Sequence, residues 1–267
     1  MDPLPALIAT EAARRVLGPS LEVVGSRLAG LTESMIDNVG RVLRSAMRKL
    51  RDDATNSFPA RTLTVIWEEA PFAEDQVAQE YFGGVLASAR SAVGRDDTAA
   101  IWAKQIAVMS SYTLRLHYTL YSAARAALVG TELNFGVDQT VYGGVFLTFD
   151  QVERGMELGP LEDFGNVLRH AFVALRNGNY IGQSSAYGLE KDLSLATKGA
   201  PIPEPGLVFY PTNEGIGLWL VAHGYGGLAN VDLFVDSSAV FEVEPGLPTE
   251  TGTSTAMLRG HTRPLTP

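Results

Sequence analysis

The feature that most constrains the fold is a change in residue pattern near position 130. Before it, apolar residues recur at three- and four-residue spacing in segments separated by polar or proline-containing breaks, which is typical of amphipathic helices. After it, glycine becomes frequent, and segments such as 141–149 are rich in β-branched and aromatic residues, as strands are. The sequence therefore predicts a mostly α, α+β protein, with an N-terminal helical region followed by a domain that has a few short strands.

The expected organisation has three parts. Residues 1–130 form an all-helical region, residues 131–245 form an α+β domain, and residues 246–267 form a disordered tail that is rich in proline, glycine and threonine and has little to bury. The clearest expected elements are a helix over 111–128, a helix over 161–176, a strand over 207–210, a Thr212-capped helix over 213–223, and strands over 231–235 and 239–243.

An apolar stripe with heptad spacing runs from residue 17 to residue 42 on what we expect to be one helix. Glycines at 25, 30 and 40 each cost about 1 kcal/mol relative to alanine, so a helix held by packing against a core is favoured over a free-standing coiled coil. The alternative is a self-association seam. Its candidate contact residues are Leu21, Val24, Leu28, Leu31 and Met35.

The same expected helix ends in a basic cluster. Cations are favoured at a helix C-terminus by the helix dipole, which is sufficient to explain most of them. The alternative is a contact with nucleic acid or an anionic lipid surface. The residues of this basic cluster are Arg41, Arg44, Arg48, Lys49 and Arg51.

Composition and motifs give no support to a catalytic function. The net charge of −9 repels polyphosphate, and the absence of cysteine excludes thiol nucleophiles and cysteine metal sites. The sequence has no phosphate-binding Gly-x-x-x-x-Gly-Lys motif and no His-Glu-x-x-His pair, and His117 falls in an apolar helix where a core role is favoured. We predict no catalytic, cofactor-binding or metal-binding residues and no cofactor, although a catalytic site assembled from distant positions stays open.

The opening residues lack the order of charge and apolar run that a secretory signal has, and no window has the length of a transmembrane helix. The lack of cysteine is compatible with a reducing compartment. We therefore expect a cytoplasmic protein.

Three parts of the sequence resemble the bacterial abortive-infection alpha (Abi-alpha) family. They are residues 17–25 with the basic helix that follows, residues 65–70 and 80–89 with the helix at 101–109, and residues 210–218. The resemblance implies a role in defence against phage, and it supplies no established catalytic residues.

The C-terminal domain is similar to a winged-helix module. The similarity lies in the order of a helix at 161–176, a glycine-containing turn, an extended arm and a capped helix at 212–223. Arg169 and Arg176 are the only cations on the first of these helices, so few phosphates can be contacted there.

Two hypotheses follow. The first is a non-enzymatic anti-phage defence protein that acts by self-assembly or by contact with a host or phage protein. The alternative is a winged-helix regulator that binds DNA. The acidic balance of the chain favours the first hypothesis.

Overall fold

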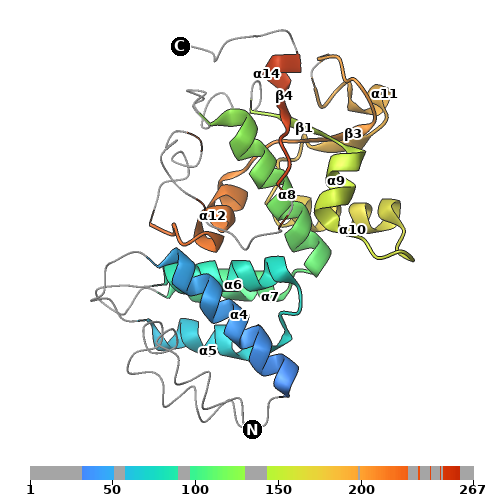
Figure 1. Cartoon of the computed structure of the whole chain (residues 1–267). Coiled ribbons are helices and arrows are strands. Elements are labelled where there is room, and N and C mark those ends of the chain that lie inside the picture. The colour runs from blue at the N-terminus through green and yellow to red at the C-terminus, as the bar shows by residue number, and fades with distance from the viewer. Residues whose placement is uncertain are drawn as a thin grey trace. The chain divides into compact units, whose positions relative to one another are not determined.

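The computed structural model describes residues 32–50, 58–89, 97–129, 143–197, 199–227 and 249–258, and the single residues 234, 241 and 247. These residues form a mostly helical α+β structure with a small antiparallel sheet in the C-terminal half (Figure 1), as the sequence predicts. No helix within the described ranges is long and apolar enough to cross a membrane. The chain divides into two compact units, which are described separately.

Unit 1 holds the described residues up to Met109 together with those in 220–227 and 241–247. Two of its helices, α4 and α6, start at side chains that accept hydrogen bonds from free backbone N–H groups: Thr32 accepts from the amide of Met35, and Asp75 accepts from those of Val77 and Ala78. The elements are α4 (Glu33–Lys49), α5 (Ala60–Glu69), the 3₁₀ turn η2 (Ala70–Phe72), α6 (Gln76–Ser88) and α7 (Thr98–Ala107).

Among the described elements of unit 1, α4 and α6 pack against each other most extensively. A Cβ placed on Gly83 of α6 would lie 2.4 Å from Cβ of Ser45, so only glycine allows this approach. Val42, which belongs to the predicted apolar stripe, is fully buried in the core of this unit. That part of the stripe is therefore used for core packing.

The prediction of a single helix from residue 17 into the basic cluster is wrong, because the chain is not helical at Thr32. This residue is extended, with φ −73° and ψ 164°, and its side chain caps α4. A threonine stabilises a helix more at the N-cap, where its hydroxyl accepts a hydrogen bond from a free backbone N–H group, than at an interior position. Met35 is half-buried on α4, whereas the other four seam candidates, Leu21, Val24, Leu28 and Leu31, lie outside the described residues.

Unit 2 holds the described residues from 110–219 with Phe234 and residues 249–258. Its sheet has the order β2-β3-β1-β4, and β1 pairs antiparallel with β3 on one side and β4 on the other. The strands are β1 (Val145–Thr148), β2 (Ala186–Gly188), β3 (Gly206–Phe209) and β4 (Thr253–Ser254). The helices are α8 (Ser111–Leu128), α9 (Phe149–Met156), α10 (Phe164–Asn177), α11 (Glu190–Leu193), α12 (Asn213–Ala222, assigned to unit 1 from Leu220) and α14 (Thr255–Leu258).

The core of unit 2 is built around α8. Tyr121 is fully buried, and its ring lies 5.6 Å from that of Phe209 on β3 and 6.4 Å from that of Trp219 on α12. Its hydroxyl donates to the carbonyl of Tyr180 and accepts from the amide of Thr212, with distances of 2.8 and 3.0 Å. The Tyr121 hydroxyl thus satisfies a buried carbonyl just after α10 and a buried amide at the start of α12.

The units do not follow the boundary expected near residue 131. The helix α8 has the predicted bounds, but it packs on α9 and α10 and belongs with the sheet. A Cβ on Gly155 of α9 would lie 2.2 Å from Oγ1 of Thr119 on α8, which shows how closely these helices approach. Unit 2 therefore begins at Ser110.

The prediction of a disordered tail over 246–267 is wrong for residues 253–258. Thr253 and Ser254 pair with Phe146 and Val145 along the edge of β1 that β3 leaves open, and α14 follows directly. A strand edge with unpaired backbone groups can order a polar segment that has few apolar side chains of its own. Phe234 is helical and Phe241 has no regular structure, so neither lies in the strand expected there, and the other residues of those two strands lie outside the described ranges.

Candidate functional site

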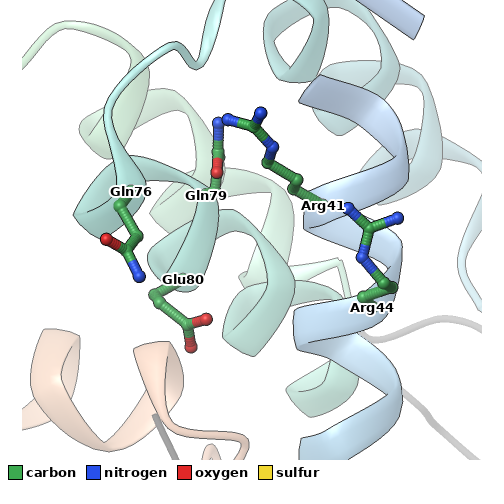
Figure 2. A pocket seen from close by; sticks show the side chains of 5 residues that line it. All are labelled: Arg41, Arg44, Gln76, Gln79 and Glu80. Atoms are coloured by element: carbon green, nitrogen blue, oxygen red, sulfur yellow. The ribbon is translucent and has the colours of Figure 1, made fainter. Parts of the chain in front are cut away.

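A pocket of about 250 Å³ in unit 1 is lined by α4 and α6 (Figure 2). Arg41 and Arg44 come from α4, one helical turn apart, and Gln76, Gln79 and Glu80 come from the first two turns of α6. All five side chains are polar. The pocket therefore presents hydrogen-bonding groups from two helices whose separation is fixed by the core beneath them.

The carboxylate of Glu80 is the centre of a buried ionic cluster. Glu80 is only 4% exposed, and its Oε2 atom lies 2.6 Å from Nζ of Lys49. Oε2 also accepts a hydrogen bond from the Ser45 hydroxyl at 3.0 Å, and Oε1 pairs with Arg48. A buried carboxylate requires such compensation, and here two cations provide it.

Lys49 is the other buried ion of this cluster, at 6% exposure. Besides its ion pair with Glu80, its ammonium donates to the backbone carbonyls of Glu80 at 2.8 Å and Ala222 at 3.0 Å, and to the Ser45 hydroxyl at 3.1 Å. This one side chain therefore ties the last turn of α4 to α6 and to the segment 220–227.

The side chain of Gln79 is also fixed. Its Nε2 donates to the carbonyl of Ala73 at 2.7 Å and to Oδ1 of Asn38 at 3.3 Å, and Asn38 donates to the carbonyl of Pro71 at 3.0 Å. By contrast, the side chains of Arg41, Arg44 and Gln76 have no hydrogen-bond or ion-pair partner among the described residues. The pocket thus combines a rigid wall with three side chains that are free to bind.

The structure divides the predicted basic cluster into separate groups. Arg48 and Lys49 are committed to Glu80, Arg41 and Arg44 are exposed beside the pocket, and Arg51 lies outside the described residues. A continuous row of five cations along a phosphate backbone or lipid surface is therefore not available. Arg48 and Lys49 do lie in the last turn of α4, where the helix dipole favours them, but Glu80 gives them a specific partner.

A second candidate surface is the exposed face of α10 in unit 2. The buried face of this helix carries Leu168, Ala171, Phe172 and Leu175. The opposite face presents exposed residues that follow the first of them by three, four, seven and eleven positions. They are Asn166, Arg169, His170, Val173 and Asn177.

The two arginines of α10 differ in what they offer. Arg169 is exposed, and its guanidinium donates to the Asn166 side chain at 3.1 Å. Arg176 is partly buried, with its guanidinium carbon 5.7 Å from the centre of the Phe172 ring. Only Arg169 therefore presents a positive charge on the exposed face.

Two carboxylates stand at the amino end of α10. Asp163 caps the helix and accepts from the amide of Asn166 at 2.7 Å. Glu162 accepts hydrogen bonds from the Tyr112 hydroxyl and from the amide of Gly159, and these bonds lower the pKa of Glu162 below its ordinary value. The end of the helix that would otherwise attract an anion is therefore negatively charged.

The histidines do not converge. His117 is fully buried, its Nε2 lies 3.1 Å from the carbonyl of Gly215, and its ring stacks on Tyr121 at 4.5 Å, so the predicted core role is confirmed. His223 is buried in unit 1, His170 is exposed on α10, and His261 lies outside the described residues. In the described part of the chain, no three His, Asp or Glu side chains are grouped to hold a metal ion.

Burial gives His117 a testable effect on stability, because desolvation lowers its pKa from 6.5 to about 3. Below pH 6.5 the unfolded chain binds a proton at His117 that the folded chain excludes. The contribution of His117 to stability is therefore complete above pH 6.5 and is lost as the pH drops from 6.5 toward 3. We expect this group to lower the free energy of unfolding by up to about 1.4 kcal/mol per pH unit. Urea unfolding from about pH 7 to about pH 5, above the range of ordinary carboxylates, measures the effect.

The variant His117→Gln tests the assignment, because its amide can still donate to Gly215 but does not titrate. It should lack the pH-dependent loss, whereas the exposed His170→Gln variant should keep it. Parallel losses of stability in the parent and in His117→Gln would show that another group is responsible.

Comparison of the chain with protein-family models, with curated proteins and with solved structures finds no match. The resemblance to the Abi-alpha family stays a prediction. The candidate surfaces therefore rest on the geometry of this chain.

Sequence reasoning missed Glu80 and the pocket around it. The available signal was a single acid in the segment 77–89, which apart from Gln79 is otherwise apolar or small. A lone carboxylate on a helix that is buried all round is almost never left without a cation. That pattern indicates a buried ion pair, but it does not identify the partner helix.

Proposed function

We propose that this chain is a non-enzymatic protein that acts in bacterial defence against phage through protein–protein contacts, with unit 2 as a contact module. The winged-helix similarity of the sequence gains support from the connectivity α8–β1–α9–α10–β2–β3, in which β3 pairs with both β1 and β2. In that arrangement α10 takes the place of the recognition helix, whose outer face meets the partner.

The observation that carries the choice of a protein partner is the character of the α10 face. It has one exposed cation, Arg169, and its amino end carries Glu162 and Asp163. DNA affinity depends on neutralising several phosphates, and these carboxylates oppose that. Val173 on the face and Leu161 just before the helix, which is 99% exposed, offer apolar area that a protein partner would bury.

The defence role rests on the resemblance to the Abi-alpha family, and the partner is a second copy of the chain or a host or phage protein. His117 and His223 are buried in the core, so neither is presented to a substrate. Expression of the chain in a bacterial host should lower phage plaquing. Unchanged plaquing across a phage panel would contradict the defence role alone.

DNA binding is the second candidate, and one observation favours it. Asn166 and Arg169 lie side by side on the exposed face of α10, and these two residue types read adenine and guanine edges in the major groove. An alternative role as a winged-helix regulator would use them there.

The contact face is tested with a photo-crosslinking amino acid at Val173 and, as a matched control, at Val108, an exposed valine of unit 1. In phage-challenged cells we expect a discrete crosslinked protein from position 173 and none from position 108. Val173→Asp should weaken binding of the identified partner about tenfold or more, because a charge would be buried in the contact, and Val108→Asp should not.

The same protein preparation distinguishes the two functions. We expect no binding to a random DNA duplex tighter than about 10 μM at physiological salt. Tighter, salt-sensitive binding that Arg169→Gln abolishes, together with no crosslink from position 173, would replace the proposal with DNA regulation.

A further inference from the structure

We propose that the pocket between Arg41, Arg44 and Gln76 binds a small molecule through a phosphate group. This inference is independent of the contact function assigned to unit 2, because every residue of the pocket belongs to unit 1. It begins from the charge of the pocket. Arg41 and Arg44 lie one turn apart on α4, and both guanidinium groups are exposed with no ion-pair partner in the described residues.

The acid in the pocket does not cancel these charges. Glu80 is already compensated by Lys49 and Arg48. Together with Arg41 and Arg44 these cations outnumber the one carboxylate that lines the pocket by three, in a chain whose net charge is −9. Asp37, one turn before Arg41, forms no ion pair with it. The pocket is therefore a positive region that is not neutralised from within.

The donor set indicates phosphate over a single carboxylate. A guanidinium group binds one carboxylate through both of its oxygens, so one arginine is enough for that ligand. Two guanidinium groups and the free amide of Gln76 match an anion with three or more acceptor oxygens and two charges, which is a phosphate monoester.

The geometry also favours a small ligand. Gln79 is held by Ala73 and Asn38, and α6 is held to α4 by Lys49, so the wall of the pocket is formed before a ligand arrives. A preformed wall lowers the ordering cost of binding. The volume of about 250 Å³ lies just below the range of drug-sized sites, so the organic body attached to the phosphate must be small.

The test is calorimetric titration of the full chain with inorganic phosphate and with ribose 5-phosphate at constant ionic strength. We expect both to bind. Tighter binding of ribose 5-phosphate would identify an organic phosphate as the natural ligand, and equal binding would identify the free anion. Arg41→Gln and Arg44→Gln should each weaken binding about tenfold or more, because each loses charge-assisted hydrogen bonds.

Arg61→Gln is the matched control, since Arg61 is an exposed arginine of the same unit that pairs with Asp97 and does not line the pocket. It removes the same charge and should leave binding unchanged. Arg41 and Arg44 are exposed, so these variants are expected to fold, which far-UV circular dichroism checks. The proposal is overturned if neither phosphate binds, if binding survives both substitutions, or if only DNA or anionic vesicles bind through Arg41 and Arg44.

Discussion

Lys49→Met should lower the free energy of unfolding by about 3 kcal/mol, the lower end of the cost of removing one partner of a buried ion pair, because Arg48 still pairs with the carboxylate. The substitution keeps the length of the side chain but removes the ammonium that lies 2.6 Å from Glu80. The carboxylate of Glu80, 4% exposed, then keeps Arg48 as its one remaining cation. The carbonyls of Glu80 and Ala222 each lose the hydrogen bond from this ammonium as well.

Lys104→Met provides the control, because Lys104 is an exposed lysine on α7 of the same unit. Its loss is expected to change the free energy of unfolding by less than about 0.5 kcal/mol, as surface substitutions do. Equilibrium unfolding in urea measures both variants. If Lys49→Met were as stable as Lys104→Met, the ion pair would contribute nothing to the stability of unit 1.

The elements that the sequence predicts well are those whose signal is local. The helix α8 has the predicted bounds, 111–128, because its apolar series is long and the residues around it stop a helix. The sequence also predicts the cap at Thr212, whose hydroxyl accepts from the amide of Gly215 at 3.1 Å. Both features depend on residues within one or two turns of each other.

Other features depend on contacts between residues far apart in the sequence. Local sequence patterns do not show which distant segments come into contact. Thr253 and Ser254 have no strand pattern of their own, and β4 forms because they pair with the open edge of β1. That edge lies more than one hundred residues away in the sequence. The pocket likewise needs α4 and α6 to be placed together, and Glu80 and Lys49 are 31 residues apart.

One missed element did have a local signal. The helix α9 is not among the expected elements, and its first residue, Phe149, falls at the end of the expected extended segment over 141–149, although Thr148 and Gln151 form a capping box. A threonine followed by glutamine three residues later marks a helix start, and it is satisfied here by hydrogen bonds of 3.0 and 3.2 Å. The β-branched and aromatic residues before it outweighed that signal.

Gly84→Ala should also cost about 3 kcal/mol or more, at or above the upper end for overpacked sites. An ideal Cβ on Gly84 would lie 1.7 Å from the carbonyl oxygen of Ala222 and 2.0 Å from its carbon. Both are backbone atoms, so no side-chain rotation relieves the overlap. Alanine favours a helix over glycine by about 1 kcal/mol, which offsets only part of the strain.

The expected consequence is separation of the segment 220–227 from α6. That movement breaks the hydrogen bonds from Lys49 to the Ala222 carbonyl and from Ser88 to the Val221 carbonyl, each 3.0 Å long. Hydrogen exchange of residues 220–227 should therefore rise together with the loss of stability. Gly227→Ala is the control, since a Cβ there meets nothing within 4 Å.

The double variant Lys49→Met with Gly84→Ala distinguishes a shared contact from two independent defects. Both substitutions act on the Ala222 carbonyl, so their combined cost should be smaller than the sum of the single costs. Additive costs would show that Gly84 acts somewhere other than at the contact between α6 and residue 222. A coupled result would identify the approach of the α6 backbone to that carbonyl as the feature that requires glycine at position 84.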